Sequence, residues 1–277
     1  MEKKRQQIGC DDCHWSGFHV VEKGTYASAE LCGCVRECVH CGGSGTILSE
    51  NKSGYSYLSP CGLCGVVRRN VKLYNLACIP AKYAHVLQVD AGLEPRKINR
   101  SLQVALKYAK EEFVKKYPTK RGFLLMGPSG LGKTHLAIGT ISELTLYHGV
   151  RCMFKDFFYL LSELKQAYSE GTGENQVIMP LIETEVLVID ELGKGRSNEW
   201  ELNILDQLIS KRYNASKKTL ITTNYVTYDV AKELGEEHEI LEVRIGERIA
   251  SRLYEMCEFM YLEGRDYRKE QKKARNA

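Results

Sequence analysis

The chain has 277 residues, of which 43% are hydrophobic and 27% are charged, and its formal net charge is +4. This length predicts one large domain and one smaller domain, and the composition excludes a wholly disordered chain. No apolar run approaches the ~18 residues of a membrane span and the charged N-terminus is unlike a secretory signal, so we expect a cytoplasmic protein with no membrane partner.

The positive charge is concentrated at the end of the chain. Six Lys/Arg stand against one Asp and one Glu in the last fourteen residues, which accounts for the whole excess. Residues 265–277 are therefore a predicted basic tail. Any contact with nucleic acid elsewhere must come from a local patch and not from the overall field.

Eight of the eleven cysteines form four closely spaced pairs near the N-terminus. These pairs are Cys10 with Cys13, Cys32 with Cys34, Cys38 with Cys41, and Cys61 with Cys64. A reducing cytosol does not sustain structural disulfides, whereas short-spaced thiolates suit tetrahedral zinc. We therefore predict a cysteine-rich module over residues 1–75 that binds two Zn²⁺ ions.

The spacing leaves the division of these ligands open. The simplest division gives the first two pairs to one ion and the last two pairs to the other, but an interleaved pairing is equally tetrahedral. Three histidines lie near the pairs and could substitute as ligands: His14, His19 and His40. Five basic residues could offset the negative charge of the sites: Arg36, Lys52, Arg68, Arg69 and Lys72. The other cysteines, Cys78, Cys152 and Cys257, are expected to be buried, inert thiols.

Alternating helices and strands are expected over residues 99–264, after a linker at residues 76–98. A helix should begin at Asn99 or Ser101 and end at Pro118. Further helices are expected at 135–148, 156–169 and 198–212, and strands at 121–126, 151–154, 186–189 and 220–223. This alternation predicts an α/β fold with a parallel sheet flanked by helices.

A phosphate-binding loop lies between the strand at 121–126 and the helix after it. Its sequence, Gly-Pro-Ser-Gly-Leu-Gly-Lys-Thr, matches G-x4-G-K-[ST] and lets backbone N–H groups point at phosphate oxygens. Lys133 is expected to contact the β- and γ-phosphates of ATP, and the Thr134 hydroxyl to coordinate Mg²⁺. The residues predicted to bind the nucleotide here are Gly127, Pro128, Ser129, Gly130, Leu131, Gly132, Lys133, Thr134 and His135.

Two acids follow the aliphatic strand at 186–189. The carboxyl ends of parallel strands open onto the ligand crevice, which places Asp190 and Glu191 beside the phosphates. Asp190 is expected to hold Mg²⁺, and Glu191 to orient and deprotonate the attacking water.

The order of four segments resembles one family of ATPases. These segments are G-P-S-G-L-G-K-T, V-L-V-I-D-E-L-G, T-L-I-T-T-N and G-E-R-I-A-S-R-L. Over about residues 79–268 the chain is similar to the AAA+ ATPases of DnaC/DnaI-type helicase loaders, whose relatives are the IstB transposition helpers. Only a short strand near 258–262 and the tail follow the last segment, so we expect a P-loop AAA+ fold without a C-terminal helical lid.

The resemblance implies roles for further residues. Asn224 matches a polar sensor that helps to position the hydrolytic water, and Tyr83 lies in a segment that packs near adenine. Arg252 matches an arginine finger that acts on the nucleotide of another subunit, with Arg248 as second candidate.

The arginines of this region have a second interpretation. If they lie on one helix, Arg244, Arg248 and Arg252 form a single stripe. Such a stripe could instead be solvated and paired with nearby acids, which are Glu239, Glu242 and Glu247.

The function implied is that of an ATPase that loads a replicative hexameric helicase onto single-stranded DNA. The N-terminal module would bind the helicase, although a DNA-binding zinc ribbon is the competing interpretation. The helix at 156–169 lies where the family binds the strand, with aromatic and basic residues at Phe157, Phe158, Lys165 and Tyr168. The core spacing of Phe157, Leu160, Leu161 and Leu164 favours burial instead. Alternatives for the whole chain are an IstB-like regulator that acts on duplex DNA with a transposase, and a non-hydrolysing nucleotide-sensing scaffold.

Overall fold

The computed structural model describes residues 9–93, 98–171, 173–235, 238–264, 266, 267 and 269. The chain forms two compact units, one with residues 1–85 and 144–151, the other with residues 86–143 and 152–277. All but three residues of the predicted basic tail lie outside the described residues. Every helix in the described part is too short or too polar to cross a lipid bilayer.

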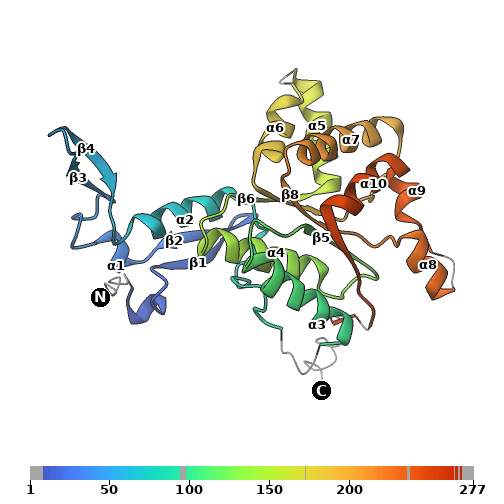
Figure 1. The fold of residues 1–277 in the computed structure, drawn as a ribbon, viewed down its shortest axis with the longest axis horizontal. Helices are drawn as coiled ribbons and strands as arrows, with labels where there is room; N and C mark the ends of the chain where they lie inside the picture. The colour runs from blue at the N-terminus through green and yellow to red at the C-terminus, as the bar shows by residue number, and fades with distance from the viewer. Residues whose placement is uncertain are drawn as a thin grey trace. The chain divides into compact units, whose positions relative to one another are not determined.

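The first unit consists of two antiparallel hairpins, short helical turns and one longer helix (Figure 1). Its elements are η1 (Asp11–Cys13), β1 (Phe18–Lys23), β2 (Tyr26–Leu31), α1 (Gly33–Arg36), β3 (Thr46–Glu50), β4 (Ser56–Pro60), α2 (Gly65–Leu76) and η2 (Ala81–Tyr83). The Asn75 side chain on α2 accepts from the N–H of Ala29 on β2 (2.7 Å) and donates to its carbonyl (3.0 Å). These bonds fix the helix to the first hairpin.

The second unit is built on a five-stranded parallel sheet in the order β6-β7-β8-β5-β9. Its strands are β5 (Gly122–Met126), β6 (Cys152–Asp156), β7 (Val186–Asp190), β8 (Lys218–Thr222) and β9 (Cys257–Tyr261). Every residue of β5 and β7 is buried, which explains their continuous apolar sequences. The predicted parallel sheet is confirmed.

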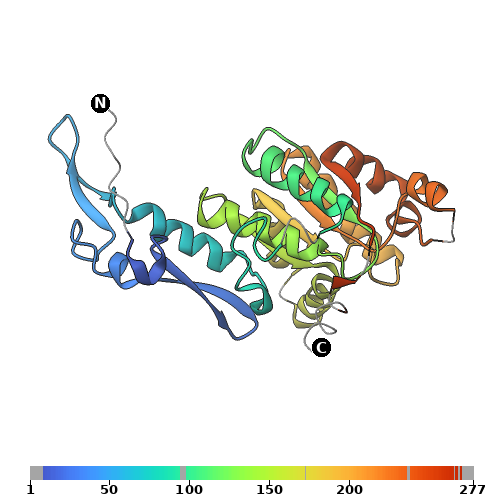
Figure 2. The same ribbon diagram turned by 90° about the horizontal axis from the view of Figure 1, so that it is seen from below.

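Helices cover both faces of this sheet (Figures 1 and 2). They are α3 (Arg100–Lys107), the π-helical η3 (Tyr108–Val114), α4 (Lys133–Leu146), α5 (Phe157–Glu170), α6 (Asn175–Glu183), α7 (Glu199–Asn214), α8 (Tyr228–Leu234), α9 (Leu241–Ile245) and α10 (Glu247–Met256). Side chains of α5, α6, α7 and α10 form one core with β5, β7 and β8. Phe113 of η3 meets Phe123 on the sheet, with ring centroids 5.8 Å apart.

Side-chain caps place the starts of several helices. Asn99 accepts from the N–H of Leu102, Asp156 accepts from two N–H groups of α5, and Asn198 accepts from the N–H of Glu201. Each cap satisfies N–H groups that have no partner inside the first turn of a helix.

Two expectations from the sequence are wrong. The arginines of residues 244–252 do not share one helix, because the chain breaks at Gly246 (φ 82°, ψ 145°) between α9 and α10. Arg244 is therefore separated from the stripe that holds the other two. Cys78 is only half-buried and adopts a positive φ of 55°, whereas Cys152 and Cys257 are buried as expected.

Arg212 on α7 is fully buried and holds the end of α6. Its guanidinium donates to the carbonyls of Leu181 (2.6 Å) and Thr184 (3.0 Å) and, on the other side, to the Lys218 carbonyl (2.5 Å). Burial lowers its pKa to about 9. The carbonyls of Leu181 and Thr184 lie in the last turn and at the C-cap of α6, so Arg212 acts as a side-chain cap of the helix C-terminus.

Replacing Arg212 by Met is expected to lower the free energy of unfolding by about 3 kcal/mol, because several buried carbonyls lose their donor. Urea unfolding followed by circular dichroism measures this change. The neighbouring exposed Lys211→Met is the control and should change stability by less than about 0.5 kcal/mol. Equal effects of the two substitutions would contradict the capping role.

Candidate functional site

The phosphate-binding loop follows β5 and curls through three glycines with positive φ. Gly127, Gly130 and Gly132 have φ values of 129°, 84° and 87°, a conformation that suits glycine. Lys133 at the start of α4 is buried, and its ammonium group donates to the carbonyls of Gly127 (2.6 Å) and Pro128 (2.7 Å). The loop can thus present its amides, its lysine and a helix N-terminus to an anion.

Polar side chains from two neighbouring strands meet this loop. Asp190 at the end of β7 accepts from the Thr134 hydroxyl (2.8 Å) and from the Thr222 hydroxyl on β8 (2.5 Å). Asn224, just after β8, accepts from the Lys133 ammonium (2.9 Å). Burial raises the pKa of Asp190, and the two hydroxyl donors partly oppose that rise. A carboxylate and a hydroxyl in contact are a donor set that suits Mg²⁺.

Glu191 follows Asp190 with an unusual backbone. Its φ is 56°, a left-handed conformation that is uncommon outside glycine and typical of functional sites. Its N–H donates to the Thr222 hydroxyl (3.1 Å), and its partly exposed carboxylate forms an ion pair with Lys194. The Glu191 side chain is 35% exposed, so a solvent molecule can reach its carboxylate.

Sequence reasoning did not identify Thr222 and Lys194. Thr222 lies in the quoted segment T-L-I-T-T-N, and its side chain bridges Asp190 and the backbone of Glu191. The alternation of a strand could have indicated it, because Thr222 lies two residues before Asn224.

The segment after β9 also reaches the loop. The Tyr267 N–H donates to the Gly130 carbonyl (3.1 Å), and the Tyr267 hydroxyl accepts from the Asn99 N–H (3.2 Å). A Cβ atom at Gly130 would lie 2.1 Å from an Asp266 oxygen, so close approach as well as φ requires glycine there. Part of the predicted tail therefore packs against the phosphate-binding loop.

Two residues predicted to bind the nucleotide have other neighbours. The His135 imidazole Nε2 lies 2.6 Å from the Ala91 carbonyl, so it ties α4 to the segment before α3. Tyr83 belongs to the first unit, where the Lys82 ammonium lies 4.9 Å from its ring centroid. Their contacts with the nucleotide stay predictions.

Arg252 and Arg248 on α10 both face one acid on α7. The Arg252 guanidinium donates to Asp206 (2.7 Å), whereas Arg248 lies 3.7 Å from the same oxygen. The Arg248 side chain is 75% exposed and that of Arg252 is 22% exposed. The partner acid is thus Asp206, and none of the three glutamates weighed from the sequence pairs with either arginine. Of those glutamates, Glu239 lies 3.8 Å from Arg244, which also stacks on the Tyr225 ring.

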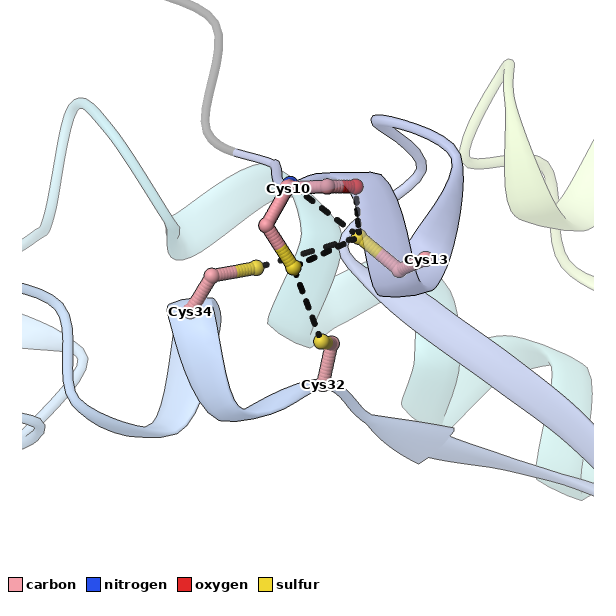
Figure 3. A group of neighbouring side chains, drawn as sticks. All are labelled: Cys10, Cys13, Cys32 and Cys34. Carbon is pink, nitrogen blue, oxygen red and sulfur yellow. Dashed lines mark hydrogen bonds between the residues drawn. The ribbon is translucent and has the colours of Figure 1, made fainter.

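The paired cysteines gather into two groups of four in the first unit. Cys10, Cys13, Cys32 and Cys34 form one group, and Cys38, Cys41, Cys61 and Cys64 form the other. Figure 3 shows the four sulfurs of the first group turned toward one another. The structure thus adopts the simpler of the two divisions.

The sulfur positions fit tetrahedral zinc. Sulfurs 2.3 Å from such an ion lie about 3.8 Å apart. Neighbouring sulfurs in the first group are 3.6 to 3.8 Å apart, and those in the second are 3.6 and 4.0 Å apart. His14 and His19 are exposed and belong to neither group, and His40 Nδ1 lies 3.3 Å from the Cys61 sulfur as a neighbour of the group.

The helix with the predicted strand-binding residues, α5, divides between core and surface. Phe157 is buried with Leu160, Leu161 and Leu164, as the core spacing favours. Phe158 and Tyr168 are half-exposed, and Lys165 lies over the Trp200 ring at 5.2 Å.

Comparisons with known proteins agree with this site. The replicative helicase loader DnaC of Escherichia coli strain K12 is 31% identical over 115 residues, covering 41% of this chain and 46% of that protein. A protein of Geobacillus stearothermophilus, named for ATP binding in insertion sequence IS5376, is 30% identical over 155 residues, covering 56% of this chain and 58% of that protein. The chain thus spans about half the length of these curated relatives.

A crystal structure of the DnaC helicase loader superimposes with a TM-score of 0.55 at 30% identity, covering 66% of this chain and 99% of that one. Residues 67–275 match the family of IstB-like ATP-binding proteins. These residues include the curled loop, Asp190 and Asn224, and they confirm the resemblance to AAA+ proteins of the DnaC/DnaI type. The chain therefore belongs to the family of IstB-like ATP-binding proteins.

Proposed function

We propose that this chain is an ATP-dependent loader that delivers a replicative hexameric helicase to single-stranded DNA. The observation that carries the proposal is the meeting of Lys133, Thr134, Asp190 and Asn224 at one edge of a sheet. The fold around this edge covers 99% of a helicase-loader structure.

Each polar group at the edge has a role in the proposed ATPase. The loop amides and Lys133 bind the β- and γ-phosphates, and Thr134 and Asp190 hold Mg²⁺, which supplies charge neutralisation on the phosphates when bound. Glu191 accepts a proton from the attacking water, and Asn224 orients that water. Arg252 acts on the ATP of a neighbouring copy, so self-association completes the site.

The first unit serves the partner helicase in this proposal. Its two cysteine groups hold one Zn²⁺ each, which fixes two hairpins that are too small to fold around an apolar core alone. The exposed aromatic rings of Phe158 and Tyr168 on α5 provide stacking surfaces for single-stranded DNA.

A second candidate is an IstB-like regulator that acts on duplex DNA with a transposase. The similarity to an insertion-sequence protein at 30% identity over more than half of this chain favours it. The ATP site serves both candidates, so the partner decides between them.

A binding experiment separates the two candidates. The purified full-length chain, ATP and Mg²⁺ are mixed either with the hexameric helicase of the same organism or with long duplex DNA. A complex of defined stoichiometry with the helicase, seen by native mass spectrometry, supports the loader. ATP-dependent filaments on duplex DNA, with no helicase complex, would support the transposition regulator instead.

Asp190→Asn is expected to abolish Mg²⁺-dependent ATP hydrolysis and yet to stabilise the ligand-free protein. The pKa of Asp190 is raised above its unfolded value of 3.8 by burial, so its ionisation costs folding free energy as pH rises through the folded-state pKa. Removing that cost is expected to raise Tm at neutral pH, by about 2–4 °C for each kcal/mol removed in a chain of this size.

Thermal unfolding at several pH values tests this prediction. The gain in Tm should shrink as the pH falls toward the unfolded pKa of Asp190, because wild-type Asp190 is then protonated. The exposed Asp229→Asn is the control and should leave Tm and hydrolysis unchanged. A lower Tm for Asp190→Asn at neutral pH would contradict the argument.

A further inference from the structure

The two cysteine groups differ in what surrounds their sulfurs. Each receives a backbone N–H from a glycine, Gly17 to Cys13 and Gly45 to Cys41, both at 3.2 Å. Within the described residues, only the sulfurs of the second group also contact polar side-chain atoms of residues other than cysteine. One of these comes from Arg68, whose Nε donates to the Cys64 sulfur at 3.3 Å.

Arg68 is placed on Cys64 by the start of α2. Cys64 is the N-cap residue of this helix, and Arg68 lies four residues later on the same face. Its Cδ also packs on Gly45, where an added Cβ would lie only 2.8 Å away. The neighbouring Arg69 points elsewhere and donates to Asn70.

The same guanidinium links the two groups. Its Nη2 donates to the Val35 carbonyl (2.8 Å) and to the Gly43 carbonyl (2.9 Å). Val35 comes directly after Cys34 of the first group, and Gly43 comes two residues after Cys41 of the second. One side chain therefore joins the thiolate of one site to the backbone of both.

The charge of Arg68 affects the two cysteine groups unequally. Zn²⁺ with four thiolates carries a formal charge of about −2, and a guanidinium in contact neutralises part of it at the second site alone. Partners that hydrogen-bond a metal ligand orient it, and losing one typically costs 10- to 100-fold in metal affinity.

We propose that Arg68 positions the Cys64 thiolate and makes the second site the tighter of two unequal zinc sites. This inference rests on the proposed binding of zinc. It predicts that the first site, formed by Cys10, Cys13, Cys32 and Cys34, releases its metal first in the wild-type protein, and that Arg68→Met removes this difference.

Chelation with mapping of the released thiols tests the inference. The zinc-loaded full-length chain is treated with excess EDTA, and freed cysteines are alkylated with iodoacetamide and quantified by mass spectrometry. In the wild type, Cys10 and Cys13 should react before Cys61 and Cys64. In Arg68→Met, modification of Cys61 and Cys64 should be about 10- to 100-fold faster.

Three variants keep the test decisive. Arg69→Met is the matched control and should behave as the wild type, since Arg69 contacts no sulfur. Arg68→Lys keeps the charge but cannot reach one sulfur and two carbonyls together, so its rate should be intermediate. Equal rates for Arg68→Met and Arg69→Met would overturn the inference, as would simultaneous release from both sites in the wild-type protein. Zinc content before chelation reports separately on the binding of zinc, and a chain without zinc would overturn both.

Discussion

Glu191→Gln is expected to lower ATP turnover by at least about 100-fold while ATP and Mg²⁺ still bind, because an amide cannot accept the proton of the attacking water. The substitution keeps the size of the side chain. Residue 191 contributes only its backbone N–H to the bond with the Thr222 hydroxyl, so the left-handed turn should persist. Phosphate release measures turnover, and titration calorimetry measures ATP binding.

The control for this prediction is Glu199→Gln, an exposed acid in the first turn of α7. It should leave both measurements unchanged. If Glu191→Gln also turned over ATP at the wild-type rate, the general-base role would be wrong. If that wild-type rate were itself no higher than background, a nucleotide-sensing scaffold would be the better account of the chain.

The residues of the candidate nucleotide site could be predicted from local sequence because they lie in short contiguous segments. The curled loop needs glycines at fixed positions, and a buried strand that ends in two acids can be recognised from the sequence alone. Thr222 was missed because its contact with Asp190 crosses between strands 32 residues apart in sequence. A threonine at that position is equally typical of an ordinary strand, because strands favour β-branched residues.

The surroundings of the arginines could not be predicted in the same way. Asp206 and Arg252 lie 46 residues apart on different helices, so their contact depends on how α7 and α10 pack. The break at Gly246, by contrast, had a signal, because glycine commonly ends helices through a positive φ. The i, i+4 spacing of the arginines nevertheless favoured the prediction of one continuous helix.

Spacing also left open which pairs of the candidate zinc ligands belong together. Short pairs show which thiolates share a turn, but not which two turns meet. In the structure β1 and β2 lie between the first two pairs, and β3 and β4 lie between the last two, so each antiparallel hairpin brings its own ends together. The hairpins therefore decide the grouping.

Arg252→Ala is expected to bind ATP normally but to lose about 1,000-fold of the turnover that self-association stimulates, as for other arginines supplied in trans. The loss arises because a positive charge that stabilises the transition state is removed. Asp206 holds the Arg252 guanidinium at 2.7 Å, so its position is fixed before assembly. Arg248 is more exposed and more loosely held, at 3.7 Å, and Arg248→Ala should cost less.

Mixing variants shows whether the arginine acts between copies. Glu191→Gln provides Arg252 without a working site, and Arg252→Ala provides a working site without the arginine, so an equimolar mixture should regain turnover that neither has alone. Arg244→Ala, whose arginine stacks on Tyr225 and lies before the break, is the control and should keep full stimulation. Size-exclusion chromatography with ATP confirms that each variant still assembles. A mixture that assembles but stays inactive would contradict action between copies. Arg252 would then act only within its own subunit, through its ion pair with Asp206.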